Sequence, residues 1–313
     1  MGNDRKIRET IDENISEGVV VTGVSASPVT DGVVGLTAAG LKALSENAND
    51  VTGLLSVKRK SAAKILSAKY VGGVISVRYE YNGEKTLSVA VNDVSSSYVL
   101  SNKTRENKAK KLENELSPKY NEFILAGSSS MENWTSSYRD MLPFTTYNVA
   151  IGGTTVKEWA NSLAERLIYP YCPRAVVLYV GINDIKGIAE NGGNLSTAGE
   201  VTANSVMEFL TAVHERLPDA TVYYVLINQI PLAYSNGQNN NYVSQINTAN
   251  ERISAFAAGK NWLVTVDADE KMVNANGVAV SSYFTDGIHM TTDGYALWSD
   301  AIKKAVAAKE KQN

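Results

Sequence analysis

The sequence FILAGSSSMENW, residues 123–134, joins a run of apolar residues to a glycine and three consecutive serines. An apolar run such as Phe123 to Ala126 is typical of a buried parallel strand, and Gly127 allows the backbone to turn sharply. The serines then fall where a helix would begin, among backbone N–H groups that favour the negative charge on a carbonyl oxygen under attack. Because Gly-Ser-Ser-Ser is also an ordinary loop sequence, this stretch indicates catalysis only together with residues further along the chain.

From Glu122 onward, apolar runs alternate with amphipathic segments. The runs predict strands at 123–126, 146–151, 175–181, 222–230 and 262–267. The amphipathic segments predict helices at about 129–141, 155–167, 197–217, 242–259 and 292–308. This alternation predicts an α/β fold with a parallel sheet covered by helices on both faces. Ligands of such sheets bind outside the carboxyl ends of the strands, so the residues that follow each strand are candidates for a site.

Three more groups of residues at or after strand ends could take part in chemistry. Gly152 and Gly153 follow the second predicted strand, where they allow close backbone approach and offer an unhindered N–H. Asn183 stands at the end of the third strand, where its amide could donate to a ligand or cap the next helix. Asp286 and His289 lie three residues apart, a spacing that lets the carboxylate accept Nδ1–H and leaves Nε2 free as a base.

The chain has two histidines, and they stand in different contexts. His214 lies in a predicted helix beside charged neighbours and is interpreted as a surface or helix-end residue. His289 is therefore the plausible general base near neutral pH. Two histidines so differently placed, with no HExxH pattern, argue against a zinc site, and we expect neither a metal nor an organic cofactor.

Four blocks together resemble, in order and spacing, those of the SGNH (GDSL-type) hydrolases. The blocks are Gly127-Ser128-Ser129, the Gly153 turn, Gly181-Ile182-Asn183-Asp184 and Asp286-Gly287-Ile288-His289. The resemblance covers residues 122 to about 308 and is closest to the platelet-activating-factor acetylhydrolase-like branch, in which a Gly-Ser-Ser-Ser run is followed by a tryptophan, here Trp134. It implies a flavodoxin-like three-layer α/β/α sandwich with a five-stranded parallel sheet, and an enzyme that hydrolyses esters.

The resemblance also implies a role for each matched residue. Ser129 would be the nucleophile, His289 the base and Asp286 its orienting group, with an oxyanion hole formed by the Ser129 N–H, the Gly153 N–H and the Asn183 amide. The sequence departs from the common pattern at one position, because Ser128 stands where the aspartate of Gly-Asp-Ser would be. The nucleophile must therefore be chosen among three serines, and Ser129 is preferred because it matches the family's nucleophile position.

The sequence says less about the substrate. The fourth predicted strand leads into AYSNGQNNNY, residues 233–242, a polar loop that could line the site or be plain surface. If it lines the site, its amides with Tyr234 and Tyr242 suit a sugar alcohol, and Trp134 is a further candidate substrate contact. We therefore favour a short-chain acyl ester, above all an acetyl ester of a carbohydrate, over a lysophospholipid or thioester. A non-catalytic binding protein with a degenerate hydrolase domain is the competing class.

Residues 1–118 are expected to form a small α+β or β-rich accessory module before a catalytic domain at 119–313. Alternating runs on either side of Asn82-Gly83 predict a hairpin, and a three-residue loop Tyr81–Gly83 with Gly83 left-handed would put Val77 opposite Leu87 and Ile75 opposite Val89. The charged residues near 103–117 predict a connecting helix. The module could bind a glycan or only pack on the catalytic domain, and packing is favoured.

Composition narrows the possible partners and compartments. The 313 residues are 44% hydrophobic and carry a net charge of −3, which supplies a sizeable core and gives no electrostatic reason to expect nucleic acid or an anionic membrane. No apolar stretch reaches the length of a membrane span, and the polar first residues do not form a signal peptide. The single cysteine, Cys172, is expected to be structural, and the protein is either cytoplasmic or secreted through a signal absent from this sequence.

Overall fold

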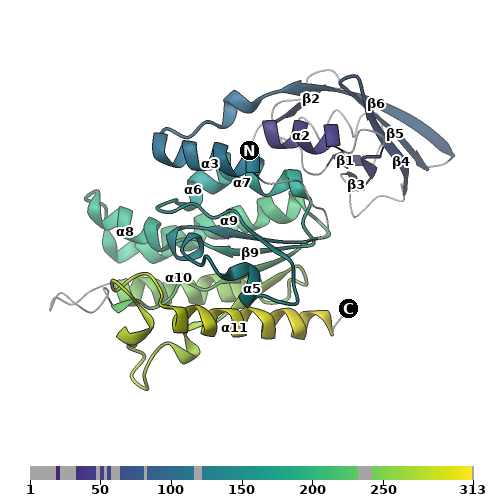
Figure 1. Cartoon of the computed structure of the whole chain (residues 1–313). Helices are drawn as coiled ribbons and strands as arrows, with labels where there is room; N and C mark the ends of the chain where they lie inside the picture. The colour runs from purple at the N-terminus through teal and green to yellow at the C-terminus, as the bar shows by residue number, and fades with distance from the viewer. Residues whose placement is uncertain are drawn as a thin grey trace. The chain divides into compact units, whose positions relative to one another are not determined.

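The computed structural model describes residues 19–21, 33–46, 50–52, 55–57, 64–80, 83–115, 122–231 and 242–311. The chain divides into two compact units, drawn together in Figure 1. Unit 1 comprises Met1–Asn121, Asn161–Pro173 and Arg216–Pro218, and unit 2 comprises Glu122–Ala160, Arg174–Glu215 and Asp219–Asn313. The predicted loop residues Tyr81 and Asn82, and the candidate substrate contact Tyr234, lie outside the described residues.

A five-stranded parallel sheet forms the centre of unit 2. Its strands are β7 (Phe123–Gly127), β8 (Thr146–Asn148), β9 (Ala175–Tyr179), β10 (Thr221–Val225) and β11 (Leu263–Val266), in the order β11-β10-β9-β7-β8. Every residue of β7 and β9 is buried, as expected for apolar runs in the middle of a sheet covered on both faces. Helices α9 and α11 lie on opposite sides of the sheet (Figure 1), which confirms the predicted three-layer sandwich.

The helices of the α/β region follow the predicted order, except that the helix at Ile182–Glu190 was not predicted and two predicted helices are divided. They are α4 (Ser129–Glu132), α5 (Ser137–Asp140), α6 (Val156–Glu158), α7 (Ala164–Leu167), α8 (Ile182–Glu190), α9 (Ala198–Arg216), α10 (Tyr242–Ala257) and α11 (Thr292–Glu310). The predicted helix 129–141 is two short helices, because the chain between them turns to bury Trp134, whose Nε1 donates to Asp140 Oδ2 at 2.9 Å. The predicted helix 155–167 contains a π-helical segment, Trp159–Leu163, between α6 and α7.

Unit 1 contains a four-stranded sheet in the order β2 (Val33–Leu36), β6 (Glu84–Asp93), β5 (Val74–Glu80) and β4 (Lys64–Val71), and a separate pair, β1 (Val19–Val21) with β3 (Leu55–Val57). The predicted hairpin register is confirmed, since Val77 pairs with Leu87 and Ile75 with Val89. Gly83 has the expected positive φ, 103°. The apolar face of the hairpin buries Ile75 and Val77 in a core shared with α2 (Ala38–Glu46).

The strand β4 was not predicted from the sequence. Its pairing with β5 shifts register between Ile65 and Ser67, so the alternation of apolar and polar residues that normally reveals a strand is interrupted there. The start of α2 is capped by Thr37, whose Oγ1 accepts the N–H of Gly40 at 3.2 Å.

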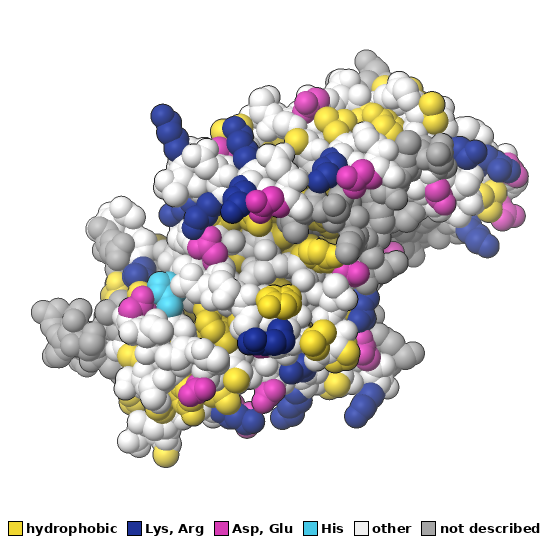
Figure 2. Space-filling model, viewed as in Figure 1, with side chains coloured by type: hydrophobic (Ala, Val, Ile, Leu, Met, Phe, Trp, Pro, Cys, Tyr) yellow, Lys and Arg dark blue, Asp and Glu magenta, His cyan; other side chains and the backbone are white. Residues whose placement is uncertain are grey.

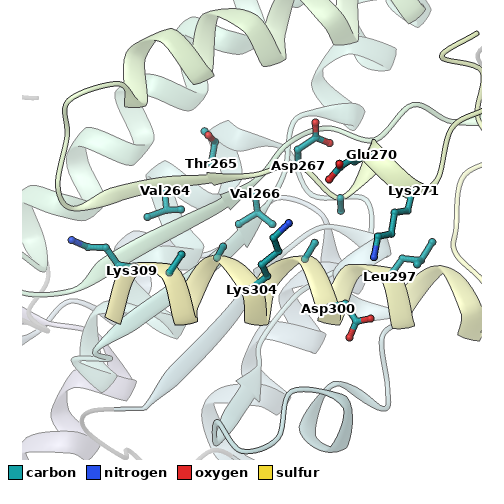
Figure 3. Close-up of a pocket in the computed structure, with 14 residues that line it drawn as sticks. Val264, Thr265, Val266, Asp267, Glu270, Lys271, Leu297, Asp300, Lys304 and Lys309 are labelled. Carbon is teal, nitrogen blue, oxygen red and sulfur yellow. The ribbon is translucent and has the colours of Figure 1, made fainter. Parts of the chain in front are cut away.

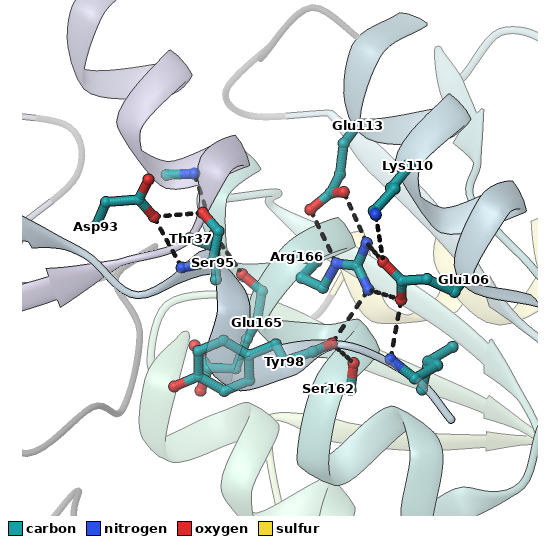
Figure 4. A network of polar contacts seen from close by, with 12 residues as sticks. Thr37, Asp93, Ser95, Tyr98, Glu106, Lys110, Glu113, Ser162, Glu165 and Arg166 are labelled. Carbon is teal, nitrogen blue, oxygen red and sulfur yellow. Dashed lines mark hydrogen bonds and ion pairs between the residues drawn. The ribbon is translucent and has the colours of Figure 1, made fainter. Parts of the chain in front are cut away.

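Within unit 1, buried polar contacts join residues before 118 to the segment 161–173 (Figure 4). Arg166 on α7 is 2.8 Å from Glu106 and 2.8 Å from Glu113, both on α3 (Lys103–Glu115). Thr37 Oγ1 also donates to the Glu165 carbonyl oxygen at 3.1 Å. The residues before 118 therefore pack on a helix that lies beyond the predicted domain boundary at 118.

The surface of the molecule carries charges of both signs. On the face shown in Figure 2, Lys and Arg side chains are interspersed with Asp and Glu side chains. This pattern agrees with the net charge of −3 and shows no broad basic patch on that face. Among the described residues, no helix combines the length and the hydropathy that a membrane span requires.

Candidate active site

A tight turn at the end of β7 presents the three serines. β7 pairs in parallel with β9, and Gly127 lies opposite Tyr179. Gly127 has a φ of 147°, and a Cβ added there would lie 2.0 Å from the Tyr179 carbonyl oxygen, so a side chain would collide with the backbone of β9. Glycine is therefore required at this position, and α4 begins two residues later at Ser129.

The three serines differ in exposure. Ser128 is fully buried and Ser130 is 1% exposed, whereas Ser129 is only partly buried. The Ser128 hydroxyl has no hydrogen-bond partner among the described residues. The Ser130 hydroxyl acts on the phenol of Tyr179, whose pKa is raised mainly by burial. Of the three hydroxyls, only that of Ser129 lies where a substrate could reach it.

Ser129, His289 and Asp286 form a hydrogen-bonded chain. The Oγ of Ser129 lies 2.8 Å from Nε2 of His289. The other ring nitrogen of His289, Nδ1, lies 2.6 Å from Oδ2 of Asp286. A carboxylate at Nδ1 favours the tautomer with a proton on Nδ1, which leaves Nε2 free to accept the Ser129 proton.

The loop that carries Asp286 and His289 is organised by the same carboxylate. Oδ1 of Asp286 accepts the backbone N–H groups of Ile288 at 3.0 Å and of His289 at 2.8 Å. Burial acts to raise the pKa of Asp286, but these bonds and the contact with the His289 ring outweigh it and lower the pKa to about 2. The carboxylate is therefore ionised across the neutral range and available to stabilise a protonated imidazole.

The predicted oxyanion donors lie at the ends of neighbouring strands. Gly153, in the turn after β8, has a φ of 75°, and its N–H has no acceptor among the described residues. Asn183 is in the first turn of α8, and its Nδ2 donates one hydrogen to the Thr154 carbonyl oxygen at 3.0 Å. The second amide hydrogen of Asn183 remains for another acceptor.

Asp184, next to Asn183, holds the same turn through a second contact. Both of its carboxylate oxygens lie 3.2 Å from the N–H of Val156. Burial raises the pKa of Asp184 to about 6. The residues Asn183 and Asp184 therefore bind backbone groups on either side of Thr155, a role for Asp184 that the sequence did not reveal.

The three predicted substrate contacts, Trp134, Tyr234 and Tyr242, differ in their position and exposure in the structure. Trp134 is fully buried, stacks on Tyr295 with the ring centroids 5.7 Å apart, and packs edge-on against Trp298. A substrate contact does not fit this position, and we correct that prediction. Tyr242 is half-buried at the start of α10, and Tyr234 lies outside the described residues.

Tyr295 is another residue that sequence reasoning missed. It is 6% exposed, and its hydroxyl donates to the carbonyl oxygen of Ser130 at 2.7 Å. Since Tyr295 belongs to α11, which follows the His289 loop, this bond links the helix after the histidine to the residue after Ser129. The Gly-Tyr pair at 294–295 gives no local signal of this long-range contact.

The second histidine, His214, lies apart from the proposed triad and makes an aromatic contact. His214 lies in α9, two residues before the helix ends, and its ring stacks on Trp262 with the centroids 4.3 Å apart. It is half-buried rather than at the surface. Within the described ranges, no group of three or more His, Cys, Asp or Glu side chains could hold a metal ion.

A groove of about 410 Å³ lies between β11 and α11 (Figure 3). Its floor is apolar and includes Val264, Val266 and Leu297, and Lys271 and Lys304 extend into it. Neither Ser129 nor His289 lines it. Because β11 is an edge strand, lysines beside it discourage another chain from pairing with its free backbone groups.

Comparison with known proteins places the chain in a family. The GDSL-like lipase/acylhydrolase family profile matches residues 118–297. The chain belongs to this family. It is thus a carboxylic ester hydrolase of the SGNH type by family, as the four sequence blocks predicted. No curated protein matches the sequence.

Three solved structures have a similar fold. A candidate platelet activating factor from Streptococcus pneumonia is 19% identical to this chain, with a TM-score of 0.53. The match covers 64% of this chain and 91% of that protein's chain. A candidate acylhydrolase from Bacteroides fragilis has 24% identity and a TM-score of 0.53, covering 66% and 96%. A GDSL-like lipase from Bacteroides thetaiotaomicron has 22% identity and a TM-score of 0.52, covering 67% and 98%. At these identities the likeness concerns the fold.

Proposed function

We propose that this GDSL-family hydrolase is a serine esterase with Ser129 as nucleophile, His289 as general base and Asp286 as the group that orients the imidazole. The observation that carries the proposal is the 2.8 Å contact between Ser129 Oγ and His289 Nε2, made by the one serine of the three that is not fully enclosed. Because Asp286 accepts Nδ1–H at 2.6 Å, the ring has a fixed orientation and a stabilised protonated form.

The reaction follows from these positions. His289 Nε2 takes the Ser129 proton as Oγ attacks the acyl carbon, and the resulting oxyanion accepts hydrogen bonds from the Ser129 N–H, the Gly153 N–H and the Asn183 amide. The tetrahedral species collapses as His289 returns the proton to the leaving alcohol, and an acyl-Ser129 ester remains. Water, deprotonated by His289, then attacks this ester and releases the acid.

For the substrate we propose a short-chain acyl ester, with acetyl preferred, on a carbohydrate alcohol. The triad lies close to solvent, since the side chains of His289 and Asp286 are 25% and 54% exposed. An open site of this kind can admit a bulky polar alcohol beside a small acyl group. The polar composition of residues 233–242 in the sequence supports the same choice. A lysophospholipase or thioesterase of this family would instead require a long apolar acyl site.

Hydrolysis of p-nitrophenyl esters from C2 to C12 tests both parts of the proposal. We expect the C2 ester to have the highest kcat/KM and Ser129→Ala to lose nearly all turnover. Equal rates for the wild type and Ser129→Ala would reject the nucleophile, and a preference for C8 to C12 would reject the short-chain assignment. Deacetylation of acetylated xylo-oligosaccharides, followed as acetate release, tests the carbohydrate alcohol. A wild type with no esterase activity would favour the non-catalytic binding protein.

A further inference from the structure

One buried threonine contacts backbone groups from both turns of the proposed site. Thr154 follows Gly153, is fully buried and lies in unit 2. Its hydroxyl donates to the Ile151 carbonyl oxygen at 2.7 Å and lies 3.2 Å from the Gly127 carbonyl oxygen. Gly127 leads directly into the serine turn, and Ile151 leads directly into the glycine turn.

The same residue takes part in two further hydrogen bonds. Its hydroxyl oxygen accepts the indole N–H of Trp159 at 2.9 Å, and Trp159 is fully buried. Its backbone carbonyl oxygen accepts the Asn183 amide at 3.0 Å. Thr154 thus touches the segments that carry all three proposed oxyanion donors, namely those of Ser129, Gly153 and Asn183.

A donor in an oxyanion hole is effective only if it points at the place where negative charge develops. Gly153 has a φ of 75° in the structure. Because glycine can adopt many backbone conformations, its own residue type does not hold the N–H in that direction. The bonds made by Thr154 remove this freedom. The bond from the Ile151 N–H to the Gly127 carbonyl oxygen, at 3.0 Å, strengthens the same junction.

We propose that Thr154 is a positioning residue for the oxyanion hole, which acts by using its hydroxyl to hold the serine turn and the glycine turn in register. This inference rests on the proposed function. Thr154 touches no reacting atom, so its removal leaves the triad able to react and weakens the stabilisation of the tetrahedral species. The loss then falls on kcat, while ground-state binding of the ester is preserved.

The test compares Thr154→Val, which removes the hydroxyl at nearly constant volume, with Thr154→Ser, which keeps it. We expect Thr154→Val to lower kcat for p-nitrophenyl acetate about 10- to 100-fold with KM within twofold, since small misplacements of catalytic groups cost factors of this order. Thr154→Ser should keep kcat within about threefold of wild type. The inhibition constant of phenylboronic acid, which forms a tetrahedral adduct with serine, should rise with Thr154→Val by the same factor as kcat/KM falls.

Thr155→Val is the matched control, because the Thr155 hydroxyl accepts the Glu158 N–H and caps α6 without contacting either turn. It should lower stability but leave kcat unchanged. Equal kcat for Thr154→Val and wild type, or equal losses in Thr154→Val and Thr155→Val, would overturn the inference. If Thr154→Val does not fold, Thr154→Ala against Thr154→Ser isolates the hydroxyl, and failure of both hydroxyl-free variants to fold would mark the role as structural only. An active Ser129→Ala enzyme would instead reject the proposed function.

Discussion

Ser129 Oγ and His289 Nε2 lie 2.8 Å apart although 160 positions separate them in the chain. The serine is held at the end of β7 in the middle of the sheet, and the histidine is held in the loop before α11. The contact therefore depends on how α11 packs against the sheet. The Tyr295 hydroxyl contributes to this packing by donating to the Ser130 carbonyl oxygen.

The neighbours of Ser129 should be dispensable for catalysis. We expect Ser128→Ala and Ser130→Ala to keep kcat within about tenfold, while Ser129→Ala loses about 10³- to 10⁶-fold. Ser128→Ala should also unfold at the same or a slightly higher urea concentration, since its buried hydroxyl has no partner to lose. Labelling with a fluorophosphonate, located by peptide mass spectrometry, checks the assignment directly. Modification at Ser128 or Ser130 in the wild type would contradict it.

The Asn183 amide should matter for turnover. Asn183→Ala is expected to reduce kcat about 10²- to 10³-fold with little change in KM, because an oxyanion donor acts mainly in the transition state. Asn191→Ala is the control, since Asn191 Nδ2 makes a comparable bond to the Gly187 carbonyl oxygen, 2.7 Å, near the other end of α8. Similar losses in both variants would show that helix stability, not the oxyanion donor, governs the effect.

Asp286 should contribute to turnover and to the stability of the folded protein above about pH 4. Its pKa is lowered to about 2, so the folded state binds fewer protons than the unfolded state between pH 2 and about 4. Its contribution to stability is therefore present above about pH 4 and is lost as pH falls toward 2. Asp286→Asn should lower kcat about 10³- to 10⁴-fold at pH 7 and weaken the fall in urea midpoint between pH 5 and pH 3. An unchanged kcat would exclude the orienting role.

The ionisation of Asp184 should change folding stability with pH in the opposite direction to that of Asp286. Burial raises its pKa from 3.8 to about 6, so the folded state holds this proton more tightly than the unfolded state. Stability is therefore lost as pH rises from about 4 to 6, by up to about 3 kcal/mol at 1.36 kcal/mol per pH unit. Asp184→Asn keeps an acceptor for the Val156 N–H and removes the charge. Its free energy of unfolding should exceed that of the wild type by a margin that grows from pH 4 to pH 7. A constant margin would contradict this.

Loss of the buried ion pairs of Arg166 should lower the free energy of unfolding far more than loss of an exposed ion pair. Arg166→Met leaves the buried carboxylate of Glu113 without the guanidinium and leaves Glu106 only the more distant Lys110 at 3.6 Å. We expect a loss of about 3–5 kcal/mol in urea unfolding. The control is Arg252→Met, whose partner Glu200 is 52% exposed at 3.4 Å and should cost less than about 1 kcal/mol. Arg166→Met combined with Glu106→Gln and Glu113→Gln should recover much of the loss. Equal costs for the two single variants would refute the comparison.

Local sequence patterns were sufficient to predict the strands of the parallel sheet, one hairpin register and one contact of the site. Alternating apolar runs indicated all five strands of the parallel sheet, and the requirement that one hairpin face be apolar determined the register of Val77 with Leu87. The Asp286–His289 contact also follows from local spacing, because a carboxylate three residues before a histidine can accept its backbone N–H and its ring N–H in one loop. Interactions between residues so close in sequence need no knowledge of the rest of the fold.

The serine run shows what the amino-acid sequence determined and what only the tertiary structure decided. The sequence determined that a glycine turn after an apolar strand presents three hydroxyls at the start of a helix. The pairing of β7 with β9 and the packing of α11 decided that Ser128 and Ser130 are buried, that Ser129 meets His289, and that Trp134 lies in the core. Burial and the meeting of distant side chains depend on how whole strands and helices pack, and a local pattern contains no information about that packing.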